Sequence, residues 1–141
     1  MAKEPRGLLA STGYLLARVG SESRRRFVQA LDEHDITLAQ YGVLMMLGEL
    51  ESAPQRGLAD AAGIDPRNLV PVLDQLERRG FLSRGPDASD RRRHAVALSR
   101  RGRTLLNELA GAGARAERDL LSPLSVSERK QLHSLLARLL P

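Results

Sequence analysis

The stretch that most constrains this fold runs from residue 57 to residue 99, GLADAAGIDPRNLVPVLDQLERRGFLSRGPDASDRRRHAVALS. A short segment of small residues comes first, and it is interrupted by Gly63, a residue that tolerates backbone conformations closed to most others. Asp65 and Pro66 then signal a helix start, because Asp can accept amide protons of the first turn and Pro is tolerated at the first helical position. This order predicts a short helix, a tight turn and a longer helix.

The longer helix has an apolar face and a second face of mixed character. Leu69, Leu73 and Leu76 recur at helical spacing, so we expect them to face the core. The positions that point elsewhere are Arg67, Asn68, Val70, Pro71, Asp74, Gln75 and Arg78. Gly80 is expected to end this helix.

A β-hairpin rich in arginine is expected next. Phe81 and Leu82 begin one strand, turn residues follow at 84–87, and the alternating segment 94–98 returns. Between Arg84 and Arg103 there are seven arginines and two aspartates. Such a cluster is either a solvated surface loop or a phosphate-binding loop that releases counterions from DNA. Next to a helix-turn-helix it favours DNA, since the two together form a winged helix-turn-helix.

The longer helix and the wing supply the candidate DNA contacts. Arg, Asn and Gln are the side chains that pair with guanine and adenine edges through two hydrogen bonds. The residues expected to face the major groove are Arg67, Asn68, Val70, Pro71 and Gln75. The wing residues expected on phosphates or in a minor groove are Arg84, Arg91, Arg92, Arg93 and His94.

Pro71 is unusual inside a recognition helix. It removes one helical hydrogen bond, to the Arg67 carbonyl, which costs about 3 kcal/mol unless the helix kinks or opens. Our hypothesis is that Pro71 bends the helix start and offers an apolar surface to thymine methyl groups.

The order and spacing of these motifs resemble the MarR family of transcriptional regulators over nearly the whole chain. The recognition-helix pattern L-D-x-L-E-x-x-G-x-[LV] stands at residues 73–82, and the wing pattern D-x-R, Leu-Thr, Gly becomes Asp90-Arg91-Arg92, Leu98-Ser99 and Gly102. The pattern of a small residue, Gly and two apolar residues matches Ala59, Gly63, Leu69 and Val72. The resemblance implies a sequence-specific regulator, usually a repressor, that binds a near-palindromic operator as a homodimer. It also places Asp90 in the DNA-binding wing, where the alternative is a purely structural role in the turn.

Helices are expected on both sides of this unit. A loose arm at residues 1–6 precedes a long helix from about Gly7 to Glu33, and a capping box at Thr37 to Gln40 begins a helix to about Glu51. Ser99 caps a helix that Pro123 ends, and a second capping box, at residues 125–128, begins the last helix. The small residues at 110–114 indicate close helix packing rather than a bend. A short strand near residues 54–56 is common in the family but has little local support here.

The expected fold is therefore mainly α with a small β-wing, comprising about six helices and a two- to three-stranded antiparallel hairpin. We expect one continuous structural domain with a dimerisation helix at 1–36, a DNA-binding lobe at 37–99 and dimerisation helices at 100–141. The resemblance, together with the dense C-terminal leucine stripe, implies a dimer interface. Its expected residues are Leu8, Leu9, Leu120, Leu121, Leu132, Leu135, Leu136 and Leu139.

The resemblance further implies a small aromatic or phenolic effector, bound between the dimer helices and the DNA-binding lobe. The candidate pocket residues are Tyr14, Phe27, His34 and Tyr41. The alternative is that these four are ordinary core and boundary residues.

Composition narrows the classes of protein to which this chain can belong. The net charge of +5 and a pI near 10.6 favour an acidic partner such as nucleic acid. The absence of cysteine excludes disulfides and thiol-based sensing, and no apolar stretch resembles a membrane span or a signal peptide, so we expect a cytoplasmic protein with no membrane partner. No catalytic motif appears and the three histidines are far apart, so we expect no enzyme, metal or cofactor.

Two alternatives stay open: a non-specific architectural DNA-binding protein, and a partner-binding domain that has lost DNA binding.

Overall fold

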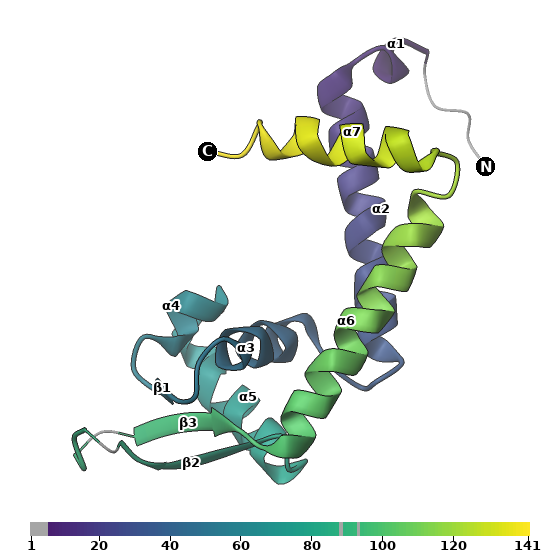
Figure 1. Ribbon diagram of the computed structural model, residues 1–141. Helices are drawn as coiled ribbons and strands as arrows, with labels where there is room; N and C mark the ends of the chain where they lie inside the picture. Colours follow the sequence, from purple (N-terminus) through teal and green to yellow (C-terminus); the bar gives the residue numbers. More distant parts are fainter. Residues whose placement is uncertain (1–5, 88, 93) are drawn as a thin grey trace.

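The computed structural model describes residues 6–87, 89–92 and 94–141. In these ranges the fold is mainly helical, with one three-stranded antiparallel sheet (Figure 1). The helices are α1 Arg6–Leu9, α2 Thr12–Asp32, α3 Leu38–Gly48, α4 Leu58–Ala62, α5 Pro66–Arg78, α6 Arg100–Leu120 and α7 Val126–Ala137. The strands are β1 Ala53–Pro54, β2 Leu82–Pro86 and β3 His94–Leu98.

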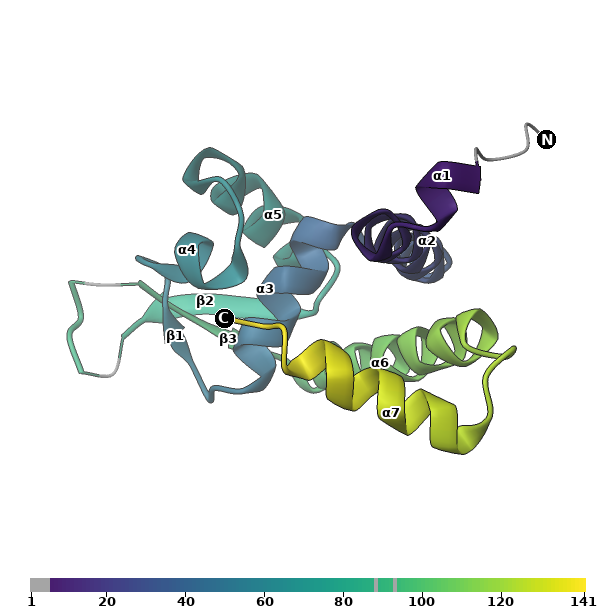
Figure 2. The same cartoon turned by 90° about the horizontal axis from the view of Figure 1, so that it is seen from above.

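The molecule has a lobe and a stalk. Helices α3, α4 and α5 gather against the sheet to make the lobe, and α2 and α6 rise from it side by side (Figures 1 and 2). Helix α7 and the short α1 lie at the far end of the stalk from the β2–β3 hairpin (Figure 1). The mainly α fold with a β-wing that the sequence predicts is confirmed.

The first helix is divided, so the prediction of one helix from Gly7 to Glu33 was wrong at its start. Ser11 separates α1 from α2, and its side chain accepts a hydrogen bond from the Tyr14 backbone N–H over 3.3 Å. A Ser at this position satisfies a free amide of the following turn, which favours a new helix start over continuation. Residues 1–5 of the expected N-terminal arm lie outside the described residues.

Three predicted helix caps are confirmed. Thr37 and Gln40 form a reciprocal capping box, and so do Ser125 and Glu128. The Ser99 hydroxyl accepts from the Gly102 N–H over 3.0 Å at the start of α6. Helix α3 ends at Gly48, earlier than the expected end near Glu51.

The sheet has the order β1-β3-β2. Strand β2 pairs with β3 from Leu82 opposite Leu98 to Pro86 opposite His94. The two-residue strand β1 pairs Ala53 with Val96, so the weakly supported third strand is present. Because a strand this short is fixed by its partner rather than by its own residues, it has no clear local signal.

The core of the lobe is aliphatic. The buried face of α5 consists of Leu69, Val72, Leu73 and Leu76, which confirms the predicted apolar face and adds Val72 to it. The stalk packs through small residues, as predicted: α6 is continuous past residues 110–114, and a Cβ placed on Gly113 would lie 3.2 Å from the Phe27 ring.

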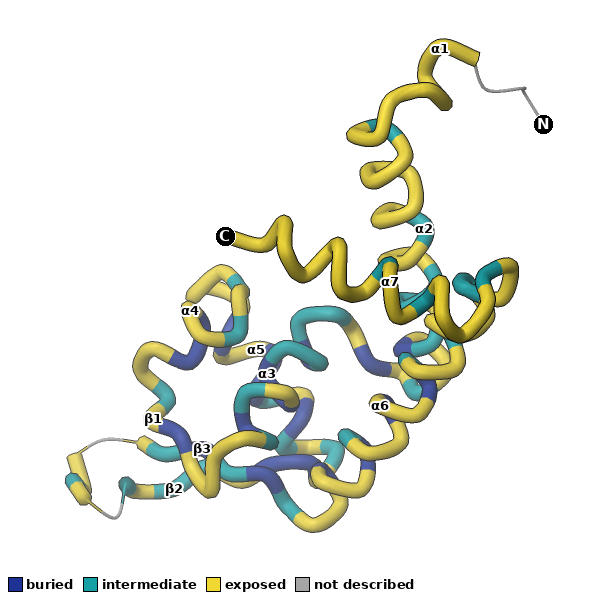
Figure 3. The backbone as a smooth tube through the Cα atoms, turned by 45° about the horizontal axis from the view of Figure 1, so that its top comes forward, coloured by how far each residue is buried: buried dark blue, intermediate teal, exposed yellow. Residues whose placement is uncertain are grey.

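Helix α7 contributes nothing to this core. None of its residues, 126–137, is buried, and Figure 3 shows most of the helix in the colour of exposed residues. Its leucines therefore do not cover the chain's own core. In the part of the chain that is described, no helix has both the length and the apolarity needed to span a membrane.

Candidate nucleic-acid interface

The turn between α4 and α5 sets the direction of the candidate recognition helix. Gly63 caps α4 in the left-handed conformation, with φ 70°, which favours glycine. Asp65 then caps α5, accepting the Arg67 backbone N–H over 2.9 Å, and the Arg67 guanidinium lies 2.7 Å from the same carboxylate. The hydrogen bonds from Arg67 lower the pKa of Asp65. The helix start is thus fixed by local interactions.

One face of α5 is open to solvent. The five residues predicted for the major groove, Arg67, Asn68, Val70, Pro71 and Gln75, are all exposed, opposite the buried leucine face. Helix α5 continues through Pro71 to Arg78 without interruption. Accordingly, α5 presents these polar and apolar side chains along one continuous exposed stripe.

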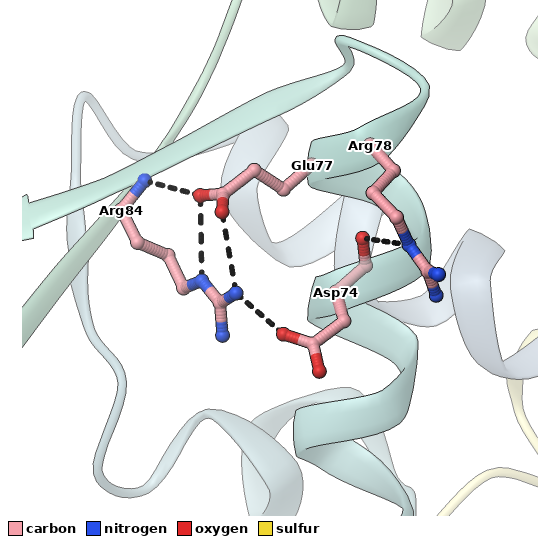
Figure 4. A network of polar contacts seen from close by, with 4 residues as sticks. All are labelled: Asp74, Glu77, Arg78 and Arg84. Carbon is pink, nitrogen blue, oxygen red and sulfur yellow. Dashed lines mark hydrogen bonds and ion pairs between the residues drawn. The ribbon is translucent and has the colours of Figure 1, made fainter.

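Arg84 joins this helix to the wing. Its backbone N–H donates to a Glu77 carboxylate oxygen over 3.0 Å, and its guanidinium donates to both Glu77 and Asp74 (Figure 4). These bonds lower the pKa of Glu77 and raise that of Arg84. The Arg84 side chain is 23% exposed and faces two carboxylates, so its charge is already balanced within the protein. The structure therefore places this predicted DNA contact at the root of the wing, where it holds the hairpin against α5.

The tip of the wing presents its arginines to solvent. Arg91 and Arg92 are exposed, as is His94 at the start of β3. Asp90 accepts the Arg92 backbone N–H over 3.0 Å, a bond typical of a turn-forming aspartate. This contact supports the structural role considered for Asp90. Arg93 lies outside the described residues.

Sequence reasoning missed one residue behind the recognition helix. Gln40, on α3, is buried, and its amide nitrogen donates to the Gln75 side-chain oxygen over 2.9 Å. Its place in the Thr37 capping box was visible in the sequence. Its contact with α5 was not, because the two glutamines are separated by 35 positions in the chain.

The candidate effector residues are only partly brought together. Phe27 and Tyr41 meet edge to face, with ring centroids 4.9 Å apart, and line a cavity of about 390 Å³ between α2, α3 and α6. Burial raises the pKa of Tyr41. Tyr14 and His34 do not line this cavity: Tyr14 lies near the other end of α2, and His34 Nδ1 is 3.9 Å from a Glu108 carboxylate oxygen.

The predicted dimer residues lie at the two ends of the chain. Leu8, Leu9, Leu135, Leu136 and Leu139 are exposed, whereas Leu120, Leu121 and Leu132 are half-buried. Both groups lie in or beside α1, α7 or the end of α6, away from the wing (Figure 1).

A helix-turn-helix with an exposed second helix, followed by an arginine-rich antiparallel hairpin, defines a winged-helix DNA-binding protein. The MarR family model matches residues 36–94. A Thauera aromatica protein, assigned as a transcriptional regulatory protein for the hcr operon, is 30% identical over 128 residues, which are 90% of this chain and 77% of that protein. The chain belongs to the MarR family of transcriptional regulators.

Solved structures agree with this assignment. A mutant of MarR from E. coli is 26% identical, with a TM-score of 0.81, and the match covers 93% of this chain and 97% of that one. CouR from Rhodococcus jostii RHA1, solved bound to p-coumaroyl-CoA, is 30% identical with a TM-score of 0.72, and the match covers 94% of this chain and 93% of that one.

Proposed function

We propose that this MarR-family protein is a sequence-specific repressor that binds a near-palindromic operator as a homodimer. The observation that carries the proposal is the division of α5 into two faces. One face is buried in the lobe, and the other exposes Arg67, Asn68 and Gln75, whose side chains suit guanine and adenine edges. An architectural protein that binds only phosphates does not need such side chains on the helix that enters the major groove.

In this proposal the wing supplies affinity and α5 supplies specificity. Arg91 and Arg92 are exposed at the tip, where they would neutralise phosphates or enter a minor groove. Arg84 and Asp90 have a different part: they shape the wing through their contacts with α5 and with the turn. Val70 and Pro71 add apolar surface to the groove-facing stripe.

The homodimer is supported by the unpartnered leucines of α7 and the residues that follow it. Leu135, Leu136 and Leu139 are 40–70% exposed, and no residue between 126 and 137 is buried. A self-complementary interface built from α1, α6 and α7 would cover them. Its two-fold axis would place two α5 helices about one DNA turn apart, which requires an operator with two inverted half-sites.

We further propose that a small aromatic or phenolic effector binds against Phe27 and Tyr41 and releases the protein from DNA. Support comes from the cavity beside these rings and from CouR, which was solved with p-coumaroyl-CoA. The stalk also contacts the recognition helix: the Arg79 guanidinium, at the end of α5, donates to the carbonyls of Asp35 and His34, directly after α2, over 2.6 and 3.1 Å. A ligand that moves α2 would act on α5 through this contact.

The first test is fluorescence anisotropy with the protein's own upstream DNA and with scrambled DNA at two salt concentrations. If each dimer contacts some 6–10 phosphates, affinity for both should fall by about 10³–10⁵ between 50 and 200 mM salt. A preference of roughly 10³ or more at fixed salt supports a specific regulator. Equal affinities, followed by a random-sequence selection that enriches no motif, would favour the architectural alternative.

The effector proposal is tested by titrating the protein–operator complex with hydroxylated aromatic acids and their CoA thioesters. We expect one of these two classes of compound to release the protein from the operator. Phe27→Ala should weaken that release. Tyr14→Ala is the matched control, because Tyr14 does not line the cavity. Equal responses from both variants and the original chain would place the effector elsewhere.

A further inference from the structure

Gln40 is a buried polar residue in contact with the proposed base-reading face. The residue is 6% exposed, and within the described part of the chain it is the one buried residue with a polar side chain. Its oxygen accepts the Thr37 backbone N–H over 3.0 Å, and its nitrogen donates to the Gln75 oxygen over 2.9 Å. Gln75, by contrast, is exposed on α5. One buried amide therefore connects a fixed backbone donor to a side chain on the recognition helix.

The direction of this chain of hydrogen bonds is set by chemistry. A glutamine amide has a donor end and an acceptor end, and its orientation follows from its partners. A backbone N–H can only donate, so the Gln40 oxygen must face Thr37. The Gln40 nitrogen must then face α5, and Gln75 must meet it with its oxygen. Neither of these two hydrogen bonds can reverse its donor and acceptor while the Thr37 capping box is intact.

We propose that Gln40 fixes the hydrogen-bond polarity of Gln75, so that Gln75 presents its amide nitrogen, a donor, to DNA. This inference rests on the proposed placement of Gln75 in the major groove. With its oxygen turned inward to accept from Gln40, Gln75 has its nitrogen as the outward end, which disfavours the two-bond contact to adenine that needs both ends of the amide. It favours base edges that offer acceptors alone, namely guanine O6 and N7, or thymine O4, over adenine, whose N6 donor beside the N7 acceptor it leaves unpaired. Gln40 is thus a positioning residue that determines specificity without touching DNA.

A substitution at residue 40 should invert this preference. In Gln40→Glu the carboxylate still accepts the Thr37 N–H, since Glu and Gln both serve at the third position of a capping box. The other carboxylate oxygen now needs a donor, so Gln75 must turn its nitrogen inward and present its oxygen outward. The base preference should move from guanine or thymine to cytosine N4 or adenine N6. Measurement at pH 8 keeps this carboxyl ionised, because two donors face it.

The experiment is a random-sequence selection, followed by anisotropy on the enriched sites, with four proteins: the original chain, Gln75→Ala, Gln40→Glu and the double variant. Gln75→Ala should remove the preference at one position of each half-site. Gln40→Glu should change the preferred base at that same position, by roughly 5- to 150-fold in relative affinity, the usual cost of one mismatched base pair. The double variant should behave like Gln75→Ala. Gln29→Glu, an exposed site on α2 with the same change of charge, should leave the position unaltered.

The outcomes separate the inference from the proposal beneath it. If Gln75→Ala changes no position, Gln75 is not in the groove, and both its proposed placement and this inference are wrong. If Gln75→Ala removes a preference that Gln40→Glu leaves intact, the placement stands and the polarity inference is overturned. Should Gln40→Glu fail to fold, as seen by circular dichroism, Gln40→Met provides the second test. It removes the inward donor, and the position should then accept adenine; an unchanged position would again overturn the inference.

Discussion

The backbone N–H of Arg84 donates to the Glu77 carboxylate over 3.0 Å, so the first strand of the wing is bonded directly to the last turn of the recognition helix (Figure 4). The Arg84 side chain reinforces this contact by donating to the same carboxylate and to Asp74. Arg84 therefore joins the wing to the recognition helix through both its main chain and its side chain.

Replacing Arg84 should impair specificity more than phosphate binding. In Arg84→Met the wing loses its side-chain bonds to α5, so we expect the preference for operator over scrambled DNA to fall. The salt dependence of affinity should stay near that of the original chain, because the Arg84 charge is balanced by two carboxylates. Arg91→Met, at the exposed tip, is the control. It should reduce the slope of log affinity against log salt concentration by about one for each phosphate that is no longer neutralised. An equal decrease of slope in both variants would show that Arg84 binds phosphate.

The same network predicts a pH dependence of stability. The Arg84 hydrogen bond lowers the pKa of Glu77, so the folded state binds this proton less readily than the unfolded chain. The resulting stabilisation is present above the unfolded pKa of Glu77, about 4.3, and is lost as pH falls through the lower folded value. Between pH 6 and pH 3 the original chain should therefore lose more stability than Arg84→Met.

Carbon-13 NMR titration of the glutamate carboxyls checks this directly. The pKa of Glu77 should rise toward its ordinary value in Arg84→Met. Glu22 is the internal control, because Arg25 and Arg26 hold its pKa at about 2 and neither contacts Arg84. A Glu77 pKa that is unchanged by the substitution would contradict the assignment of its cause.

Two glycines of α6 should respond oppositely to alanine. A Cβ on Gly102 would lie 2.0 Å from the Phe81 carbonyl oxygen, a backbone atom, whereas a Cβ on Gly111 would meet nothing within 4 Å. We expect Gly102→Ala to lower the free energy of unfolding by about 3 kcal/mol, the upper end for an overpacked site. Gly111→Ala should raise it by about 1 kcal/mol through helix propensity. Urea denaturation at one protein concentration measures both, and similar values would refute the close approach of α6 to Phe81.

The features that the sequence predicted correctly are those encoded over a few residues. The Thr37 and Ser125 capping boxes, the turn at Gly63 and the buried leucine face of α5 each depend on neighbours within one or two helical turns. The position of Ser11 was also local, but its capping role was missed because the surrounding residues are compatible with a continuous helix.

The features that sequence reasoning missed depend on tertiary contacts. Strand β1 exists because Val96 offers a partner to Ala53, and Arg84 is drawn from the surface by two carboxylates on another element. Gln40 on α3 donates a hydrogen bond to Gln75 on α5. In the candidate site, residue types and exposed positions were therefore predictable, but the hydrogen bonds that orient them were not.

Pro71 should limit the stability of α5. The helix continues through this residue, which has no N–H to give to the Arg67 carbonyl. Pro71→Ala should thus raise the free energy of unfolding, by up to about 3 kcal/mol, while Pro66→Ala, at the first helical position, should change it little. If Pro71 also contacts a thymine methyl, a random-sequence selection with Pro71→Ala will lose one thymine preference. An unchanged motif would reject that contact and leave the stability prediction standing.

The leucines at the C-terminal end allow assembly to be tested apart from folding. Leu135 and Leu139 are four residues apart and are 56% and 70% exposed, so glutamates there should not disturb the fold of a single chain. In a dimer interface the same glutamates would place charge in an apolar contact, which is strongly unfavourable. We expect the double variant Leu135→Glu/Leu139→Glu to sediment as a monomer, keep its circular dichroism spectrum and lose most of its operator affinity. Gln131→Glu, an exposed charge change on the same helix, should remain dimeric. A double variant that still sediments as a dimer would move the interface away from α7, because two buried carboxylates on each subunit could not leave such an interface intact.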